Sequence, residues 1–442
     1  MSQILIIKSK IKNFNKQIRV SGDKSLSIRW VLLASQAIGK SKAYNLLMSE
    51  DVLAAINSIK KLGIKVVIHK NYCEIFGNGI NGFKYKKNLT INARNSGTFG
   101  RLILGLLIKS PHKVKLIGDK SLSKRDFSRV TLPLEKFGTK FYYKIKNKLP
   151  LSILGSQSPK GIKYLEYKGS AQCKSSVMFA ALNASGTTYI KAKKSRNHSE
   201  LLFKYLKIPI KIKTTKKYDF IDIKKPKKIK AFNYQIPGDI SSSAFFMVLT
   251  TLTNNSRLLI KDVNINPSRA GVITILKKMG AKIILENQRS YRGEKISNIL
   301  IESSNNLKAI NCPSELNSNA IDEFLVIFLA AAKAKGISYF KDVSELNQKE
   351  SPRLKWGSKI LNMMGVKTEL AKDSIKIYGQ PDLKITKQIT IKNYLKDHRV
   401  FMMSTIAALT FGGQWKIYDQ DSINTSFPSF LKIIKKISNK SL

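Results

Sequence analysis

The stretch SLSIRWVLLASQAIG, residues 25–39, begins with serines and continues as an almost wholly apolar segment. An apolar segment of this length without a polar face predicts a helix that is buried on all sides. Five further segments have the same form, and together the six define a repeat: NSGTFGRLILGLLIKS (95–110), GSAQCKSSVMFAALNASG (169–186), DISSSAFFMVLTTLTNNS (239–256), AIDEFLVIFLAAAKAKG (320–336) and KDHRVFMMSTIAALTFGG (396–413).

The repeat is regular along the chain. Its six helix starts, near residues 25, 96, 170, 241, 322 and 397, are 71, 74, 71, 81 and 75 residues apart. Each apolar segment is followed by a strand-like run, such as TTYIKA (187–192) or SRLLIK (256–261). Repeats of about 70 residues are too long for a solenoid and indicate compact α/β units that pack together.

A second helix, with one apolar face, follows in each repeat. Examples are AAINSIKKLGIKVVI (54–68) and ITILKKMGAKIIL (273–285). Four of these helices are followed by a glycine, where a left-handed C-cap is favourable: Gly63, Gly138, Gly280 and Gly365. Each repeat is therefore predicted to run strand, buried helix, strand, amphipathic helix, strand. Six repeats predict two similar α/β domains of three units each, with the N-termini of the buried helices facing a cleft between the domains.

Composition narrows the class of protein. The chain has 442 residues, of which 43% are hydrophobic, and this is enough for two medium-sized cores. Its formal charge is +51, but only 13 of the 79 basic residues are Arg, and the Lys residues are spread over nearly every segment. Nucleic-acid-binding proteins normally gather basic residues in one stripe or module, which is absent here. We expect no nucleic-acid partner, and any duplex binding should be lost at moderate salt.

Cysteine usage and hydropathy indicate a location. Cys73, Cys173 and Cys312 are far apart and odd in number, which argues against a disulfide framework or a zinc cluster. No apolar run reaches the ~18 residues of a membrane-spanning helix. The N-terminus lacks the apolar core and cleavage site of a signal peptide. The sequence therefore predicts a cytoplasmic protein without a membrane partner.

Polar side chains are concentrated at the starts of the buried helices and in three charged loops, 121–129, 195–200 and 347–353. The basic side chains suit the binding of phosphate and carboxylate groups; they are Lys24, Arg125, Arg353 and Arg399. Neutral hydrogen-bond donors are Ser25, Ser170 and Gln172. Asp322 and Glu350 are candidates for the catalytic base and acid. A single residue of this kind would be interpreted as a cap or a solvated charge. Their recurrence at one phase of the repeat predicts a site for small dianionic substrates.

Two of these positions have a plainer interpretation. The fourth helix start, within GDISSSAFF (238–246), is interpreted mainly as capping and packing. His398 is interpreted as a structural donor, because only four histidines occur and none has the paired spacing of metal ligands. No metal site is predicted.

The motifs at these positions resemble those of the enolpyruvyl transferases, in family order and over nearly the whole chain. They are GDKSLSIR (22–29), NSGTFGRL (95–102), GDKSLSKRDF (118–127), LPLSILG (149–155), GSAQCKSS (169–176), SRNHSE (195–200), PGDISSSAFF (237–246), IDEFLVIFLAAAKAKG (321–336), ELNQKESPR (345–353), DHRVFMM (397–403) and TSFPSF (425–430).

The resemblance implies a fold and a reaction. The fold is an inside-out α/β barrel in two domains, 22–237 and 1–21 plus 238–442, with the active site in the interdomain cleft. The reaction is the one on the way to chorismate and the aromatic amino acids: the enolpyruvyl group of phosphoenolpyruvate moves to the 5-hydroxyl of shikimate 3-phosphate, and phosphate is released. It proceeds by addition and elimination without metal or organic cofactor. A monomer is expected.

The resemblance also implies residue roles. Asp322 would take the proton of the 5-hydroxyl, while Lys24 and Glu350 would move protons at the methylene carbon. Phosphoenolpyruvate would be held by Lys24, Asn95, Gly97, Arg125, Gln172, Arg353 and Arg399. Shikimate 3-phosphate would be held by Lys24, Ser25, Arg29, Ser170, Ala171, Gln172, Ser195, Asp322 and Lys349.

Three positions depart from the family pattern. Pro352 stands where an acidic residue usually precedes the arginine, Arg94 replaces a small residue, and Thr425 stands where some members have Lys. A sister enzyme that uses UDP-N-acetylglucosamine is the nearest alternative. It typically has Asn after its first Lys and a reactive Cys in the loop after the second unit. This chain has Ser25 after Lys24 and no Cys in residues 110–129, which favours the shikimate branch.

Overall fold

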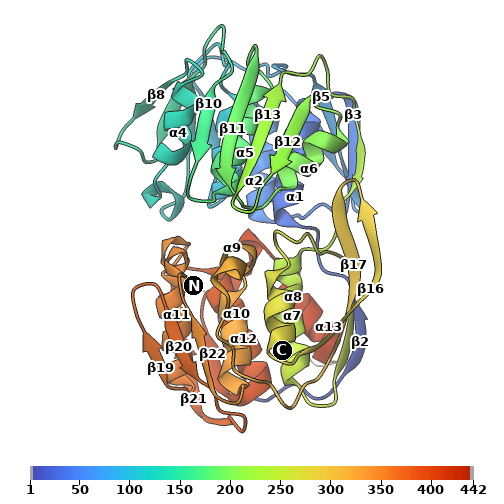
Figure 1. Ribbon diagram of the computed structural model, residues 1–442, viewed down its shortest axis with the longest axis vertical. Helices are drawn as coiled ribbons and strands as arrows, with labels where there is room; N and C mark the ends of the chain where they lie inside the picture. The colour runs from blue at the N-terminus through green and yellow to red at the C-terminus, as the bar shows by residue number, and fades with distance from the viewer. Residues whose placement is uncertain (1–2, 439–442) are drawn as a thin grey trace. The chain divides into compact units, whose positions relative to one another are not determined.

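The computed structural model describes residues 3–438 and contains two compact units (Figure 1). The N-terminal unit comprises Gly22–Ile236 and the short segment Tyr291–Glu294. The C-terminal unit comprises the described part of Met1–Ser21, together with Pro237–Ser290 and the described part of Lys295–Leu442. Each unit has its own hydrophobic core.

Three four-stranded sheets form the outside of the N-terminal unit (Figure 1). In each sheet one edge strand is parallel to its neighbour and the other pairings are antiparallel. In sheet order the strands are β14 (Asn233–Gln235), β3 (Ile38–Tyr44), β5 (Tyr72–Asn78) and β4 (Lys65–Ile68); β6 (Leu89–Asn92), β7 (Val114–Ile117), β9 (Leu151–Leu154) and β8 (Lys140–Tyr143); β10 (Lys163–Glu166), β11 (Thr187–Lys193), β13 (Tyr218–Lys224) and β12 (Ile210–Thr214).

The C-terminal unit repeats this plan with one four-stranded and two three-stranded sheets. Their strands are β2 (Asn15–Ile18), β15 (Arg257–Asn264), β17 (Glu294–Glu302) and β16 (Lys282–Tyr291); β18 (Ile337–Phe340), β20 (Ile375–Tyr378) and β19 (Thr368–Leu370); β1 (Leu5–Ile7), β22 (Gly412–Ile417) and β21 (Ile385–Ile391). The N-terminal strand β1 pairs with β22, so that Leu5 lies opposite Ile417.

The six apolar segments form the buried helices, as predicted. They are α1 (Lys24–Ser35), α3 (Gly97–Leu106), α5 (Ala171–Ala181), α7 (Ile240–Leu252), α10 (Phe324–Lys333) and α12 (His398–Phe411). All residues of α7 and α12 are buried, because neither helix has a polar face to offer to water. Within the C-terminal unit α7, α10 and α12 pack on one another, and within the N-terminal unit α3 packs on α1 and α5.

The amphipathic helices also form where the sequence predicted them. They are α2 (Glu50–Lys61), α4 (Ser128–Glu135), α6 (His198–Tyr205), α8 (Gly271–Lys278), α11 (Arg353–Met363) and α13 (Phe430–Ser438). The four glycines that follow α2, α4, α8 and α11 all have positive φ, between 85° and 93°, as a left-handed C-cap requires. A further one-turn helix, α9 (Asn317–Ala320), precedes α10.

The predicted repeat was incomplete in one respect. Each full repeat ends in an antiparallel hairpin, such as β4–β5 or β8–β9, so that it contains one strand more than predicted. The apolar helices such as α7 and α12 lie in the interior, and the strands between residues 3 and 438 form six separate sheets rather than one closed barrel. Between residues 3 and 438, no helix is both long and apolar enough to cross a membrane.

Candidate active site

The start of α1 carries Lys24 and Arg29. Asp23 precedes the helix, and its Oδ1 accepts a hydrogen bond from the Leu26 amide at 2.9 Å, which caps the first turn. Lys24 Nζ lies 2.9 Å from Asp51 Oδ2 on α2, and 23% of its side chain remains exposed. This ion pair fixes the ammonium at the helix start while leaving part of it accessible.

Arg29 is one turn further along α1 and is almost completely buried. Its Nε donates to Ser199 Oγ at 2.8 Å, and its Nη2 donates to Ser175 Oγ at 3.0 Å. Its Nη1 donates to the carbonyl of Ser25 at 3.1 Å. These three oxygen atoms accept hydrogen bonds from the guanidinium and hold it in one orientation.

The start of α3 lies beside two further guanidinium groups. Asn95 Nδ2 donates to Asp119 Oδ2 at 2.6 Å, and Asn95 Oδ1 accepts from Arg125 Nη2 at 3.4 Å. A Cβ atom added to Gly97 would lie 2.9 Å from Arg101 Nη1 and 3.2 Å from Arg125 Nη1. Glycine at this position therefore lets both arginines approach the N-terminus of α3, where the helix dipole favours anions.

Arg101 links the start of α3 to the start of α5. Its Nη1 donates to Gln172 Oε1 at 2.6 Å, and Gln172 Nε2 donates to Thr98 Oγ1 at 3.0 Å. Burial lowers the pKa of Arg101, and the nearby charges of Arg125 and Arg129 act in the same direction. An arriving anion would relieve this crowding of positive charge.

The start of α5 presents a cap and a backbone loop. Ser170 Oγ accepts from the amide of Cys173 at 3.3 Å, and Ala171 is the first helical residue. The amides of Gly169 and Ser170 donate to Glu166 Oε2 at 2.6 and 2.9 Å. Ser195 Oγ, in the loop before α6, is buried without a hydrogen-bond partner in the described part of the chain.

In the C-terminal unit, the predicted residues form one cluster. Asp322 Oδ1 lies 3.7 Å from Lys349 Nζ and 3.6 Å from Arg353 Nη1. Glu350 Oε2 accepts from Arg353 Nη2. Arg399 Nη1 donates to the carbonyl of Asp322 at 2.5 Å. Asp322 therefore contacts three cations, and one of them, Arg353, also contacts the candidate acid Glu350.

Asp397 organises this cluster and is completely buried. Its Oδ2 accepts from Arg353 Nε at 2.9 Å and Ser351 Oγ at 2.8 Å, and its Oδ1 accepts from the amide of Arg399 at 3.0 Å. Burial has the largest single effect and would raise the pKa of Asp397, but the charge and hydrogen bond of Arg353 and the nearby His398 together outweigh it, so that the pKa is lowered. Burial would likewise lower the pKa of Arg353, but Asp397 and Glu350 raise it. Both groups are therefore charged at neutral pH.

The fourth helix start does more than its interpretation as a cap implied. Asp239 does cap α7, because its Oδ1 accepts from the amides of Ser241 and Ser242. In addition, Ser241 Oγ donates to Glu323 Oε1 and accepts from Arg269 Nη2 at 2.7 Å. This buried network ends at the residue next to Asp322. Sequence reasoning missed this network, because Arg269 and Glu323 lie 28 and 82 positions away from Ser241 and no local pattern links them to it.

The three departures from the family pattern have local explanations. Pro352 occupies the N-cap position of α11, and Arg353 is supported by Asp397 and Glu350 instead of by its predecessor. Arg94 is exposed, with φ of 48° in a turn. Thr425 Oγ1 lies 3.2 Å from Nδ1 of His398, within hydrogen-bond distance.

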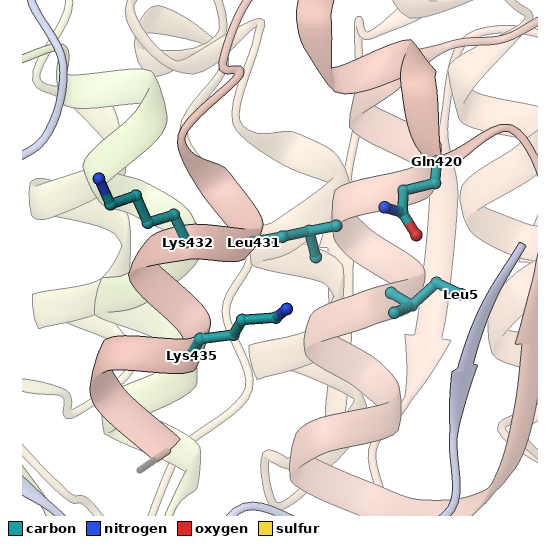
Figure 2. A pocket seen from close by; sticks show the side chains of 5 residues that line it. All are labelled: Leu5, Gln420, Leu431, Lys432 and Lys435. Carbon is teal, nitrogen blue, oxygen red and sulfur yellow. The ribbon is translucent and has the colours of Figure 1, made fainter. Parts of the chain in front are cut away.

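One surface pocket lies elsewhere. It measures about 300 Å³ and lies in the C-terminal unit between α13 and β1 (Figure 2). Its lining consists of Leu5, Gln420, Leu431, Lys432 and Lys435, none of which is a predicted site residue. The pocket therefore has no part in the candidate site.

Comparison with known proteins identifies the class and then the family. The chain superimposes on the enolpyruvyl transferase NikO from Streptomyces tendae with a TM-score of 0.78 at 11% identity, a likeness of fold. EPSP synthase from Acinetobacter baumannii matches with a TM-score of 0.86 and 33% identity over 99% of this chain and 98% of that one. The fold is thus that of the enolpyruvyl transferases.

Sequence comparison is more specific. The family model for EPSP synthase (3-phosphoshikimate 1-carboxyvinyltransferase) matches residues 8–434. Relatives named 3-phosphoshikimate 1-carboxyvinyltransferase are 40% identical in Ruthia magnifica, over 95% of this chain and 94% of the relative, and 34% identical in Bacillus subtilis, over 98% and 100%. The chain belongs to the EPSP synthase family.

Proposed function

We infer that this protein transfers the enolpyruvyl group of phosphoenolpyruvate to the 5-hydroxyl of shikimate 3-phosphate and releases phosphate. It thereby serves the synthesis of chorismate and the aromatic amino acids. The observation that carries this inference is the cluster in which Asp322 lies beside Lys349 and Arg353, within a chain of this family. Two substrates that each carry several negative charges need fixed cations, and the attacking hydroxyl needs a base.

The proposed mechanism has an addition step and an elimination step. Asp322 accepts the proton of the 5-hydroxyl as that oxygen attacks C2 of phosphoenolpyruvate, and a proton is delivered to C3, so that a methyl group forms. In the second step a proton leaves the methyl group, the double bond returns, and the C–O bond to phosphate breaks. Lys24 and Glu350 are proposed to move the protons at C3. Each has a fixed partner, Asp51 and Arg353 respectively.

We propose that each of the two substrates is bound by its own set of cations. Arg125, Arg353 and Arg399 would hold phosphoenolpyruvate, together with Lys24, Asn95, Gly97 and Gln172. Arg29 and Lys349 would hold shikimate 3-phosphate, together with Lys24, Ser25, Ser170, Ala171, Gln172, Ser195 and Asp322. The preset hydrogen bonds of Arg29 support this assignment, because an oriented guanidinium binds an oxyanion with less loss of side-chain entropy.

Phosphate release from the purified protein tests the function. With phosphoenolpyruvate and shikimate 3-phosphate, phosphate should appear together with one equivalent of the enolpyruvyl product. UDP-N-acetylglucosamine should give none in the same assay. The proposal would be contradicted if the folded protein released phosphate only with UDP-N-acetylglucosamine, or if it released no phosphate with either acceptor.

Two further expectations belong to this proposal. We propose a monomer in the cytoplasm whose domains are 22–237 and 1–21 plus 238–442. The three cysteines are free thiols buried in the described structure, as suits a reducing compartment. Size-exclusion chromatography with light scattering tests the monomer, and cell fractionation tests the location.

A further inference from the structure

The first turn of α6 contains three consecutive polar residues that are all buried. His198, Ser199 and Glu200 are 0%, 0% and 3% exposed. Burying polar groups is unfavourable unless each finds a partner. Three in succession on a helix point in different directions, so three different elements must supply those partners.

Ser199 and Glu200 find their partners on buried helices of the same unit. Ser199 Oγ accepts from Arg29 Nε of α1 at 2.8 Å and shares a hydrogen bond of 2.7 Å with Ser175 of α5. Glu200 Oε1 lies 2.5 Å from Lys174 Nζ, and both groups are buried. The first turn of α6 is thereby hydrogen-bonded to Arg29, which is proposed to bind shikimate 3-phosphate.

The third partner comes from a distant part of the sequence. His198 Nδ1 lies 2.7 Å from Glu294 Oε1, 96 residues further along the chain, and both side chains are completely buried. Glu294 belongs to the segment Tyr291–Glu294, which forms the turn between β16 and β17 and is part of the N-terminal unit.

This turn is held in place by its other residues. The Arg292 guanidinium lies 4.7 Å from the ring centre of Tyr205, at the end of α6, and 5.5 Å from that of Tyr234. Tyr291 Oη accepts from the amide of Gln235 at 2.9 Å. The turn therefore contacts both ends of α6, and its carboxylate reaches the imidazole from a fixed position.

We propose that Glu294 is a positioning residue for the binding of shikimate 3-phosphate, which rests on the function proposed above. Glu294 fixes the His198 ring and with it the first turn of α6, and that turn places Ser199 Oγ against Arg29 Nε. The same turn follows the loop that contains Ser195. Without the carboxylate, the buried imidazole loses its partner and the first turn of α6 must shift. Arg29 then loses its preset orientation.

Three variants and a matched control test this proposal. Glu294→Ala removes the acceptor, Glu294→Asp retracts it by one methylene, and Glu294→Gln keeps an acceptor oxygen in place. Tyr291→Phe removes a hydrogen bond from the same turn without touching His198. The measurements are steady-state kinetics with each substrate varied, and direct titration of shikimate 3-phosphate onto the folded variant.

Glu294→Ala should raise the KM and the Kd for shikimate 3-phosphate about tenfold, as expected for loss of one charge-assisted hydrogen bond. The KM for phosphoenolpyruvate should change much less. Glu294→Asp should fall between Ala and the wild type, and Glu294→Gln should restore most of the affinity. Tyr291→Phe should lower the Tm and raise the KM for shikimate 3-phosphate less than Glu294→Ala does, because the contact between Glu294 and His198 remains. If the Ala variant does not fold, the Asp variant carries the test.

Unchanged affinity for shikimate 3-phosphate in folded Glu294→Ala or Glu294→Asp would overturn the proposal, as would equal increases in both KM values. If the wild-type protein releases no phosphate in the presence of shikimate 3-phosphate, the failure does not concern Glu294. That outcome would reject the proposed function itself, so the two failures can be told apart.

Discussion

Replacing Asp397 with Asn should destabilise the C-terminal unit strongly. The change is nearly isosteric, and the remaining side-chain oxygen can still cap α12 by accepting from the Arg399 amide. What is lost is the negative charge opposite Arg353, which is 2% exposed and donates to both carboxylate oxygens, at 2.9 and 3.2 Å. In the variant one of these donors faces an amide NH₂ group instead.

The size of the effect follows from the burial of the pair. Removing one partner of a buried ion pair costs about 3–5 kcal/mol. Glu350 and Asp322 remain near Arg353 and compensate in part, so we expect the lower end, about 3 kcal/mol of the free energy of unfolding. Asp262→Asn is the matched control, because Asp262 pairs with Arg19 and Arg289 at the surface. It should cost less than about 1 kcal/mol.

Urea unfolding followed by circular dichroism and tryptophan fluorescence measures both variants. The pH dependence gives a second check. Because the pKa of Asp397 is lowered in the folded state, its stabilisation is complete above the unfolded value of about 3.9 and is lost as the pH falls through the lower folded value. The gap between wild type and Asp397→Asn should be full at neutral pH and shrink in acid. A gap no larger than that of the Asp262 control, or one that persists unchanged in strong acid, would refute the reasoning.

Three further predictions concern the site and the thiols. Asp322→Asn should keep the unfolding midpoint within error and lower turnover by about 10²- to 10⁴-fold; turnover near the wild-type rate would exclude its role as the base. Gly97→Ala places a methyl group 2.9 Å from Arg101 Nη1, so the KM for phosphoenolpyruvate should rise about tenfold, and more than that for shikimate 3-phosphate; equal changes would contradict this. Burial raises the pKa of Cys73 to about 12 and of Cys312 to about 11. Iodoacetamide at pH 8 should therefore label the native protein slowly and the urea-unfolded protein at all three cysteines; rapid native labelling would show that a thiol is exposed.

The sequence was sufficient for the parts of the fold that depend on local pattern. Helices without a polar face, such as α7 and α12, are marked by composition alone, and the glycines after four outer helices mark where those helices end. The strands that follow the buried helices were also predictable from their β-branched and aromatic residues, as in β11 and β15. The second strand of each hairpin, such as β5 or β13, was not predicted, although each of these two strands has seven residues.

The candidate site was predictable only as a set of residue types. The motifs drew attention to Arg29 and Arg353, but their partners lie on other elements of the fold. Ser199 is 170 positions away from Arg29, and Asp397 is 44 positions away from Arg353. Asp51, which pairs with Lys24, lies on an amphipathic helix where an acidic residue in the first turn is ordinary. Such pairings are set by tertiary packing, for which a single sequence has no local signal.

The strand pairing of the chain ends has a consequence for biosynthesis. β1 pairs with β22 and β2 pairs with β15, so these two strands leave the ribosome before their partners at residues 415–417 and 257–260 have been made. The last strand in the three sheets of the N-terminal unit is β14, at residues 233–235, which pairs with β3. These sheets can therefore form while the rest of the chain is still being synthesised, and the segment Tyr291–Glu294 joins the unit later. The opening segment, with apolar residues at Leu5 and Ile7, stays unpaired throughout that time, and is the part of the nascent chain that a chaperone would shield.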